Sequence, residues 1–235
     1  MSDLTADRFV SELKAFQSDH ERAKIRRYFR ADGPDNDVIG VRMRQLFDTA
    51  KQYTGMSLAQ VEKLLDSPYY EARMGAVSIL DFKARKRSLT DDDRRALYEL
   101  YLRRHERINN WDLVDRSAPR VIGAYLADRP RDVLYRLAGS ENIWQRRTAV
   151  VATWYLIFRD DLDDAFALAA ALLQDHEELI NKAVGTTLRY AGDRDRARLL
   201  AFLDERAGHM PRVTLRYAIE KLDPPTRKHY LSLGR

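Results

Sequence analysis

The sequence of 235 residues contains no cysteine. This excludes disulfide bonds, thiolate nucleophiles and zinc or iron–sulfur sites held by cysteine. The 10 glycines and 7 prolines are few for an all-β protein, in which turns use both residues. No apolar run is long enough to cross a membrane, and residues 1–16 lack the apolar core of a signal peptide. We therefore expect a cytoplasmic protein that does not enter membranes.

The net charge is only a weak indication of a nucleic-acid partner. The formal net charge is +5, from 41 Lys and Arg against 36 Asp and Glu. For a polyanionic partner the clustering of charge on one face matters more than this modest excess. The five histidines are scattered without the spacing of metal ligands, so we expect no metal site and no cofactor. They are His20, His105, His176, His209 and His229.

Helical periodicity runs from end to end of the chain. Apolar residues recur at steps of three and four, for example at Leu162, Phe166, Ala169 and Leu173. Helix-start signals occur at Ser57, followed by Gln60 three residues later, and at Thr90, followed by Asp93. Proline and glycine breaks near residues 33–34, 67–68, 129–130, 192–193, 208–211 and 224–225 divide the chain into short helices. The pattern predicts an all-α protein.

A degenerate repeat indicates how these helices are arranged. The stretches 66–76, 139–149, 175–183 and 210–218 each run from a polar turn, through a basic residue, to a small alanine. With one more alanine, the repeated positions are Ala76, Ala118, Ala149, Ala183 and Ala218. This spacing predicts a superhelical stack of antiparallel helix pairs, a HEAT-like or armadillo-type solenoid, as a single domain over residues 1–235. The alternative is an irregular helical bundle.

The basic residues of these stretches suggest a surface. Arg73, Arg147, Lys182 and Arg216 would lie along equivalent helices and could form a strip spaced for a nucleic-acid backbone. The alternative is that each side chain lies over its own repeat as a solvated cap on apolar surface. The spacing alone leaves both interpretations open.

The stretch 107–119 carries the strongest chemical signal. Trp111 and Asp115 are four residues apart and therefore share a helix face, which is offset from the apolar stripe that includes Val114 and Ala118. A carboxylate beside an aromatic wall could stabilise developing positive charge. Alternatively, Asp115 pairs with a neighbouring arginine and Trp111 packs between repeats.

The heptad Asn109-Asn-Trp-Asp-Leu-Val-Asp115 resembles the signature of the AlkD-like DNA alkylation-repair glycosylases. Further segments that resemble this family follow in the same order, at residues 27–29, 40–42, 140–147, 179–185 and 210–221. The resemblance covers about residues 20–232. It implies a HEAT-like solenoid that grips double-stranded DNA and acts as a monomer, without metal or cofactor, near the nucleoid when bound to DNA.

The resemblance also implies an activity. Such enzymes hydrolyse the N-glycosidic bond of positively charged alkylated purines, such as N3-methyladenine and N7-methylguanine, in base excision repair. They are thought to do so without flipping the base into a pocket, so no deep pocket is needed. One ionised carboxylate can stabilise the oxocarbenium-like sugar and orient a water molecule.

Roles carry over only at matching positions. Asp115 matches the catalytic aspartate, Trp111 an aromatic beside the deoxyribose, Arg147 a phosphate-contacting arginine and Tyr28 a tyrosine lining the cleft. The full set of residues expected to contact DNA is Tyr28, Arg42, Arg44, Arg73, Arg147, Lys182, Thr186 and Arg189.

One position departs from the family. Where the family usually has a second tryptophan facing the first across the cleft, this chain has Thr186. Thr186 can hydrogen-bond phosphate or water but offers no indole face, and Tyr190 lies one turn further along. This departure supports the alternative of a helical-repeat DNA-binding protein with weak or no catalysis. A protein–protein scaffold is a third possibility, which predicts no salt-sensitive DNA affinity.

Overall fold

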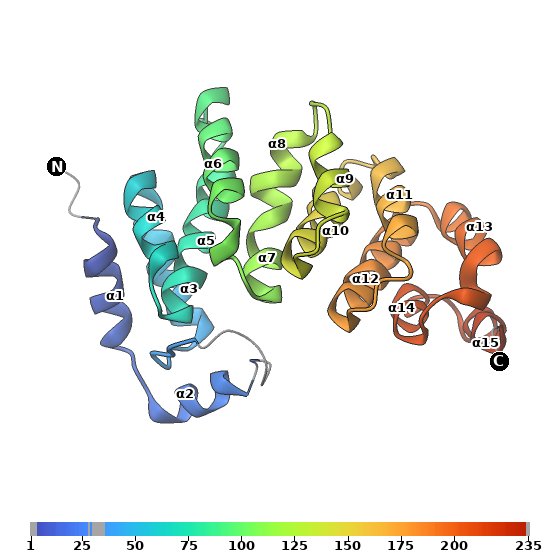
Figure 1. Cartoon of the computed structure of the whole chain (residues 1–235), viewed down its shortest axis with the longest axis horizontal. Coiled ribbons are helices and arrows are strands. Elements are labelled where there is room, and N and C mark those ends of the chain that lie inside the picture. Colours follow the sequence, from blue (N-terminus) through green and yellow to red (C-terminus); the bar gives the residue numbers. More distant parts are fainter. Residues whose placement is uncertain (1–3, 28, 30–35, 234–235) are drawn as a thin grey trace. The chain divides into compact units, whose positions relative to one another are not determined.

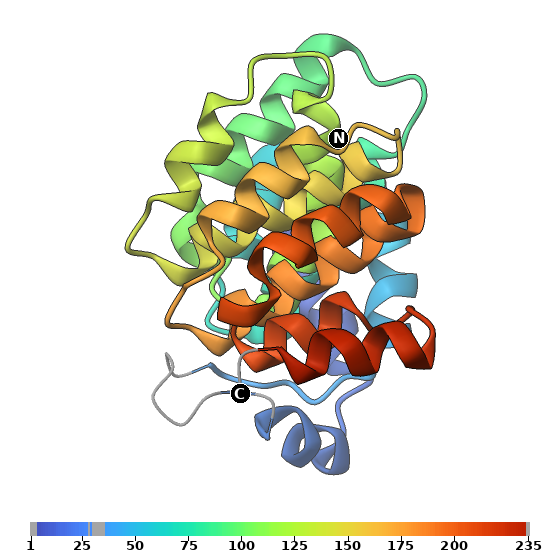
Figure 2. The ribbon, with the colours of Figure 1, turned by 90° about the vertical axis from the view of Figure 1, so that its right-hand side faces the viewer.

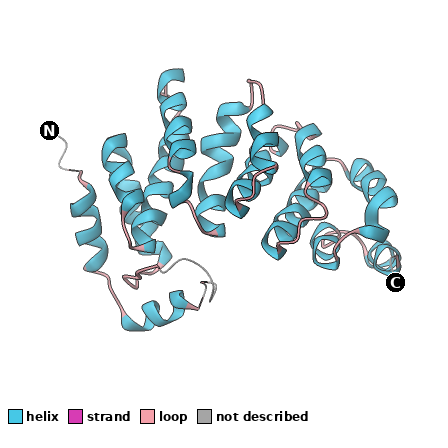
Figure 3. Cartoon of the chain, in the orientation of Figure 1, coloured by secondary structure: helices cyan, strands magenta, loops and turns pink. Residues whose placement is uncertain are grey.

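The computed structural model describes residues 4–27, 29 and 36–233. Throughout this part of the chain the regular elements are helices, and only one isolated bridge, between Asp37 and Tyr69, has the pairing of a β-sheet (Figure 3). The predicted all-α class is confirmed. By internal contacts the chain divides into two units, Met1–Ser117 and Ala118–Arg235.

Unit 1 contains the N-terminal helices (Figure 1). They are α1 (Ala6–Lys14), α2 (Asp19–Arg26), α3 (Met43–Gln52), α4 (Leu58–Asp66), α5 (Tyr70–Ala84), α6 (Asp91–Arg103) and most of α7 (Trp111–Ala118). Short 3-10 turns lie at Tyr53–Gly55 and His105–Arg107. Helix α5 packs against α3, α4 and α6, and it is buried along nearly its whole length. It is therefore the core helix of this unit.

Unit 2 begins with a π-helical turn, Pro119–Gly123, and the short α8 (Ala124–Leu126). Its further helices are α9 (Asp132–Ala138), α10 (Ile143–Ile157), α11 (Asp163–Ala171), α12 (Glu178–Arg194), α13 (Arg196–Arg206), α14 (Arg212–Ala218) and α15 (Pro224–Ser232), with a 3-10 turn at Ala207–His209. Helix α12 packs against α10, α11, α13 and α14. In Figure 2 the orange and red helices of this unit run alongside one another, as expected for stacked pairs.

The helix-start signals are present in the structure. Thr90 and Asp93 form a complete capping box before α6. Ser57 accepts a hydrogen bond from the backbone N–H of Gln60 before α4, while the Gln60 side chain accepts one from the N–H of Ala6. The first helix is thereby tied to the start of the fourth.

The repeated alanines lie in the core. Ala76, Ala118, Ala149, Ala183 and Ala218 are all buried, with at most 1% of their surface exposed. Gly185, two residues after one of them, allows a close approach of two helices, because a Cβ there would lie 2.5 Å from Cβ of Tyr217 and 2.6 Å from the carbonyl oxygen of Thr214. Small side chains therefore set the contact between α12 and α14.

Candidate active site

Trp111 and Asp115 lie in unit 1 on α7, and both are more exposed than the two apolar residues between them. Leu113 and Val114 are completely buried, whereas Trp111 is 38% exposed and Asp115 is half-buried. The backbone N–H of Trp111 donates to Oδ1 of Asn110 at 3.0 Å, which satisfies one free donor of the first turn. The helix thus presents an indole and a carboxylate together, one turn apart, on a face outside the core.

Arg116, the basic residue that follows Asp115 in the sequence, contacts α5. Its guanidinium lies 3.1 Å from Oδ2 of the buried Asp81 and donates to Oγ of Ser78 at 3.2 Å. It also stacks 4.8 Å from the ring centre of Phe47 and 4.7 Å from that of Phe82. Arg116 therefore has a carboxylate partner on another helix, so holding Arg116 is not what requires an aspartate at position 115.

A second carboxylate on α7, that of Asp112, points to α5. Its Oδ2 accepts a hydrogen bond from the Tyr70 hydroxyl, and its Oδ1 accepts one from the N–H of Leu113 at 2.9 Å. Burial raises the pKa of Asp112 to about 6, although both hydrogen bonds act against this rise. Burial and the adjacent Asp112 carboxylate also raise the pKa of Tyr70 above its ordinary range. Sequence reasoning missed this pair because its members are 42 residues apart.

Arg73 does not occupy the surface position predicted for it. Its side chain is 2% exposed and donates to the carbonyl oxygens of Ser67 at 2.8 Å and Pro68 at 3.1 Å, and to Oδ1 of Asn36. Burial lowers the pKa of Arg73 to about 10. Arg73 therefore clamps the turn before its own helix, and we remove it from the expected DNA-contacting set.

The other predicted residues of unit 1 lie nearer the surface. Arg42 precedes α3, with 72% of its side chain exposed, and lies 3.3 Å from Oε1 of Glu21. Arg44 is 94% exposed and 3.9 Å from Oδ2 of Asp48. Both guanidinium groups are largely exposed to solvent. Tyr28 lies outside the described residues.

In unit 2, Arg147 and Lys182 lie on neighbouring helices. Arg147 is largely buried, and its Nη1 donates at 2.5 Å to the carbonyl oxygen of Leu179 in the first turn of α12. Lys182 lies 2.6 Å from Oε1 of Glu178, one turn earlier, and this hydrogen bond raises the pKa of Lys182. A role of either residue toward phosphate remains a prediction.

Two aromatic residues lie close to the position of Thr186, whose side chain is half-buried. The Trp154 indole N–H donates to Oγ1 of the adjacent Thr187 at 2.7 Å, and its ring meets that of Tyr190 edge-on at 5.2 Å. Arg189 pairs with Glu220 and stacks 5.3 Å from the Tyr190 ring. Unit 2 thus carries an indole from α10 beside α12, although not at position 186.

The structure also shows the true register of the helical repeat. Arg73 reaches back six and five residues to backbone carbonyls, and Arg146 does the same, at 3.0 Å to Ser140 and 2.9 Å to Glu141. In the next pair, Nδ2 of Asn181 donates to the carbonyl oxygen six residues earlier, at 3.1 Å. The residues that contact the preceding turn are therefore Arg73, Arg146 and Asn181, whereas the basic residues chosen from the sequence were Arg73, Arg147 and Lys182.

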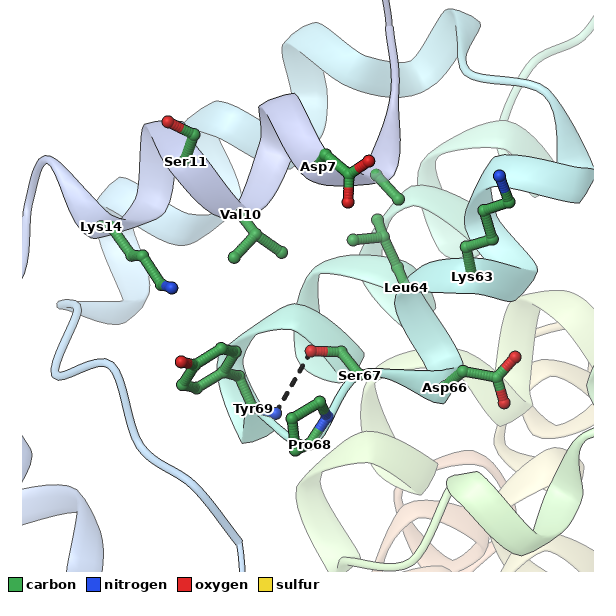
Figure 4. A pocket seen from close by; sticks show the side chains of 11 residues that line it. Asp7, Val10, Ser11, Lys14, Lys63, Leu64, Asp66, Ser67, Pro68 and Tyr69 are labelled. Atoms are coloured by element: carbon green, nitrogen blue, oxygen red, sulfur yellow. Dashed lines mark hydrogen bonds between the residues drawn. The ribbon is translucent and has the colours of Figure 1, made fainter.

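A groove in unit 1 lies between α1, α4 and the turn that follows α4 (Figure 4). In it the Lys14 ammonium lies 4.7 Å from the centre of the Tyr69 ring, and Oγ of Ser67 accepts a hydrogen bond from the Tyr69 N–H at 3.2 Å. Its lining mixes apolar, acidic and basic side chains and includes neither Trp111 nor Asp115. This groove is therefore not part of the candidate site.

The described residues contain neither a candidate metal site nor a membrane-spanning helix. Among residues 4–27, 29 and 36–233, no group of three or more His, Cys, Asp or Glu side chains is arranged to hold a metal ion. Within the same ranges no helix has the length and apolar character needed to cross a membrane.

The chain is similar to a solved structure and to a known protein family. No curated protein matches it. A solved structure described as a predicted DNA alkylation repair enzyme from Enterococcus faecalis has a TM-score of 0.69 and 18% identity, covering 88% of this chain and 97% of that one. At this identity the likeness establishes the fold. The family model described as DNA alkylation repair enzyme matches residues 9–222. This match over most of the sequence shows that the chain belongs to the family of DNA alkylation repair enzymes.

Proposed function

We propose that this protein is a DNA glycosylase that hydrolyses the N-glycosidic bond of positively charged alkylated purines in duplex DNA. The observation that carries the proposal is the joint presentation of Trp111 and Asp115 on α7, outside the core, in a chain of the DNA alkylation repair family. A carboxylate on a surface that binds only phosphates would repel them, so its presence there favours a chemical role.

The chemistry requires only one carboxylate. An alkylated purine such as N7-methylguanine already carries positive charge, so the electron pair of its bond to C1′ leaves with the base without prior protonation. The sugar becomes oxocarbenium-like, and the ionised Asp115 carboxylate stabilises this cation. Water then attacks C1′ and gives its proton to the carboxylate, which leaves a free neutral base and an abasic sugar. Because the base needs no protonation, the reaction proceeds without flipping it into a pocket.

Trp111 contributes an aromatic wall beside the same carboxylate. The electron-rich face of an indole attracts a cation, so it favours the cationic sugar over the neutral substrate. Its 38% exposure leaves ring surface available for this contact. The effect is smaller than that of the carboxylate, because a cation–π contact near the surface contributes only about 0.5–2 kcal/mol.

The proposed DNA contacts come from basic side chains that already have acidic partners. A glutamate or aspartate lies beside each of Arg42, Arg44, Lys182 and Arg189. In three of these four pairs the acidic side chain is at least half exposed. Exposed ion pairs contribute only about 0–1 kcal/mol, so a phosphate can replace the carboxylate at small cost. The proposed set that contacts the DNA backbone also includes Thr186, Tyr28, which lies outside the described residues, and Arg147, which is largely buried and would reach phosphate beside its hydrogen bond to the carbonyl oxygen of Leu179.

Thr186 limits the rate of base release that we propose for this protein. A hydroxyl at this position can bind phosphate or water, whereas it cannot supply an indole face to the sugar. The nearby Trp154 and Tyr190 are held by hydrogen bonding and ring packing, so they do not turn freely toward a ligand. We therefore expect slower base release than in relatives with two facing tryptophans.

The test is base release from a duplex oligonucleotide carrying one N7-methylguanine, measured under single-turnover conditions. We expect release by the wild-type protein and a loss of about 100-fold or more in Asp115→Asn. DNA affinity should be equal or tighter in this variant, because a negative charge has been removed. Asp132→Asn removes the same charge from an exposed helix start and should leave the rate unchanged.

A second candidate function is DNA binding without useful catalysis, which the threonine at position 186 favours. Tight, salt-dependent binding with no base release in any protein would support this function and exclude the glycosylase. Absence of DNA binding would instead favour a scaffold for other proteins. Trp111→Ala should slow base release less than Asp115→Asn does, and Phe16→Ala, which removes another exposed aromatic of unit 1, should leave the rate unchanged.

A further inference from the structure

Helix α7 is tied to α5 at both of its ends. At its start, the Tyr70 hydroxyl of α5 donates to Oδ2 of Asp112. At its end, Arg116 pairs with Oδ2 of Asp81 at 3.1 Å, again on α5. Asp115 lies between the two ties. The helical run continues past α7 through the π-helical turn and α8, and Leu113 and Val114 pack in the core. The two polar contacts therefore add to this packing in fixing the orientation of the first turn.

The hydrogen bond at the start of α7 comes from a side chain that is itself held in place. Tyr70 is 4% exposed, and its backbone N–H donates to the carbonyl oxygen of Asp37 at 2.8 Å. Its ring meets that of Phe29 edge-on, with 5.1 Å between the ring centres. The hydroxyl therefore has a defined position and direction, as a side chain that orients another group requires.

Two backbone N–H groups in the first turn of α7 have partners within the same short segment. The N–H groups of Trp111 and Leu113 are satisfied locally, by the side chains of Asn110 and Asp112. The hydrogen bond from Tyr70 joins this turn to a different helix. Because Asp112 belongs to the turn that carries Trp111 and precedes Asp115 by three residues, moving it rotates both candidate site residues.

We propose that the Tyr70–Asp112 pair is a positioning device that holds the first turn of α7 so that Trp111 and Asp115 face the reacting sugar. This inference rests on the proposed glycosylase function. Reaction rates depend steeply on the placement of reacting groups, and a displacement of about 1 Å can slow a reaction about 100-fold. The pair acts through α7 and does not touch the substrate.

Single-turnover base release in Tyr70→Phe tests the proposal, because this change removes only the hydroxyl. We expect release to slow about 10-fold, while affinity for undamaged duplex DNA changes less than about twofold. Tyr230→Phe is the matched control, since the Tyr230 hydroxyl also donates to a carboxylate, that of Asp204 at 2.6 Å, and the residue is 3% exposed and lies in unit 2. The control should release base at the wild-type rate.

Variants at Asp112 separate positioning from general weakening of the fold. Asp112→Ala should match the slow rate of Tyr70→Phe, and the double variant should be no slower than either single one. Asp112→Asn keeps one acceptor for the Tyr70 hydroxyl and should return the rate to within about threefold of wild type. Equal rates in wild type and Tyr70→Phe, or fully additive losses in the double variant, would overturn the proposal.

Hydrogen exchange decides the question independently of catalysis. We expect Tyr70→Phe to increase the exchange rates of the backbone amides in α7 about 10-fold more than those in α10, measured by mass spectrometry on the full chain. Unchanged exchange in α7 would contradict the positioning role. If the wild-type protein releases no base while α7 exchanges faster in the variant, only the glycosylase proposal and the rate effect fail.

Discussion

At the start of α5 in unit 1 and of α10 in unit 2, an arginine makes the same hydrogen bonds to the preceding turn. The two arginines differ in their further partner. Arg73 and Arg146 each donate to two carbonyl oxygens of the turn before their helix. Arg146 also pairs with the buried Asp175 at 2.6 Å, which joins α10 to the following helix pair. Arg73 instead binds the amide oxygen of Asn36. Unit 2 thus uses its arginine to connect repeats.

The first turn of α5 makes further connections through its neighbours. Tyr70 holds the start of α7, and the Glu71 carboxylate accepts hydrogen bonds from the backbone N–H groups of residues 39–41. The corresponding residues of α10, counted from the clamping arginine, are Ile143 and Trp144, which have no carboxylate. The repeat therefore supplies a common scaffold, and the departures from it lie next to the candidate site.

The largest effect should follow removal of the clamp in unit 2. Arg146→Ala leaves Asp175 buried without its cation and should lower the free energy of unfolding by about 3–5 kcal/mol. Arg73→Ala breaks hydrogen bonds to neutral acceptors and should lower it by about 2 kcal/mol. Urea unfolding measures both, with the exposed Arg95→Ala as control. Equal losses would mean that the two clamps do not differ as described.

A smaller effect should follow in Glu71→Gln. The carboxylate is completely buried and accepts from Ile39 at 2.9 Å, Gly40 at 2.7 Å and Val41 at 3.3 Å. Hydrogen bonds to a charged acceptor contribute more than those to a neutral one, so we expect a loss of about 2 kcal/mol in urea unfolding. Glu99→Gln, at an exposed site on α6, should be nearly neutral. A loss below about 0.5 kcal/mol in Glu71→Gln would show that these amides gain little from the charge.

These contacts indicate how far sequence reasoning can reach. The helical class, the capping box at Thr90 and the burial of the repeated alanines depend on local periodicity and local hydrogen bonds, so they could be predicted. The exposure of Trp111 beside the buried Leu113 follows from the same helical spacing.

The register of the basic residues could not be obtained from the alanines. The interval from basic residue to alanine is three residues at Arg73 but one at Lys182, because the alanine is set by packing between helices. The clamp is instead counted from the preceding turn, six residues before Arg73 and Arg146. A polar residue followed six positions later by Arg or Asn was the available signal. The Tyr70–Asp112 contact has no local signal at all.

The smallest predicted effect is one of pH on Asp112. Its pKa is raised by burial to about 6, above the value of about 3.9 in an unfolded chain, so the folded protein binds more protons between these values. The contribution of this group to the free energy of unfolding therefore falls as the pH rises through 6. From pH 7.5 to about pH 5, the stability of wild type relative to Asp112→Asn should increase by roughly 1 kcal/mol.

Urea unfolding of both proteins at the two pH values measures this difference. Asp132→Asn, at an exposed position in unit 2, should show no such change relative to wild type. The same difference between wild type and Asp112→Asn at both pH values would contradict the burial of an ionisable carboxyl at the start of α7.

We propose that Asp115, presented with Trp111 on α7, performs the chemistry. The most direct measurement is the single-turnover rate of base release from duplex DNA carrying N7-methylguanine, compared between wild type and Asp115→Asn. If Asp115 has this role, wild type releases the base and the variant loses about 100-fold or more of the rate, with DNA affinity maintained. Equal rates in the two proteins, or DNA binding without release by wild type, would contradict it.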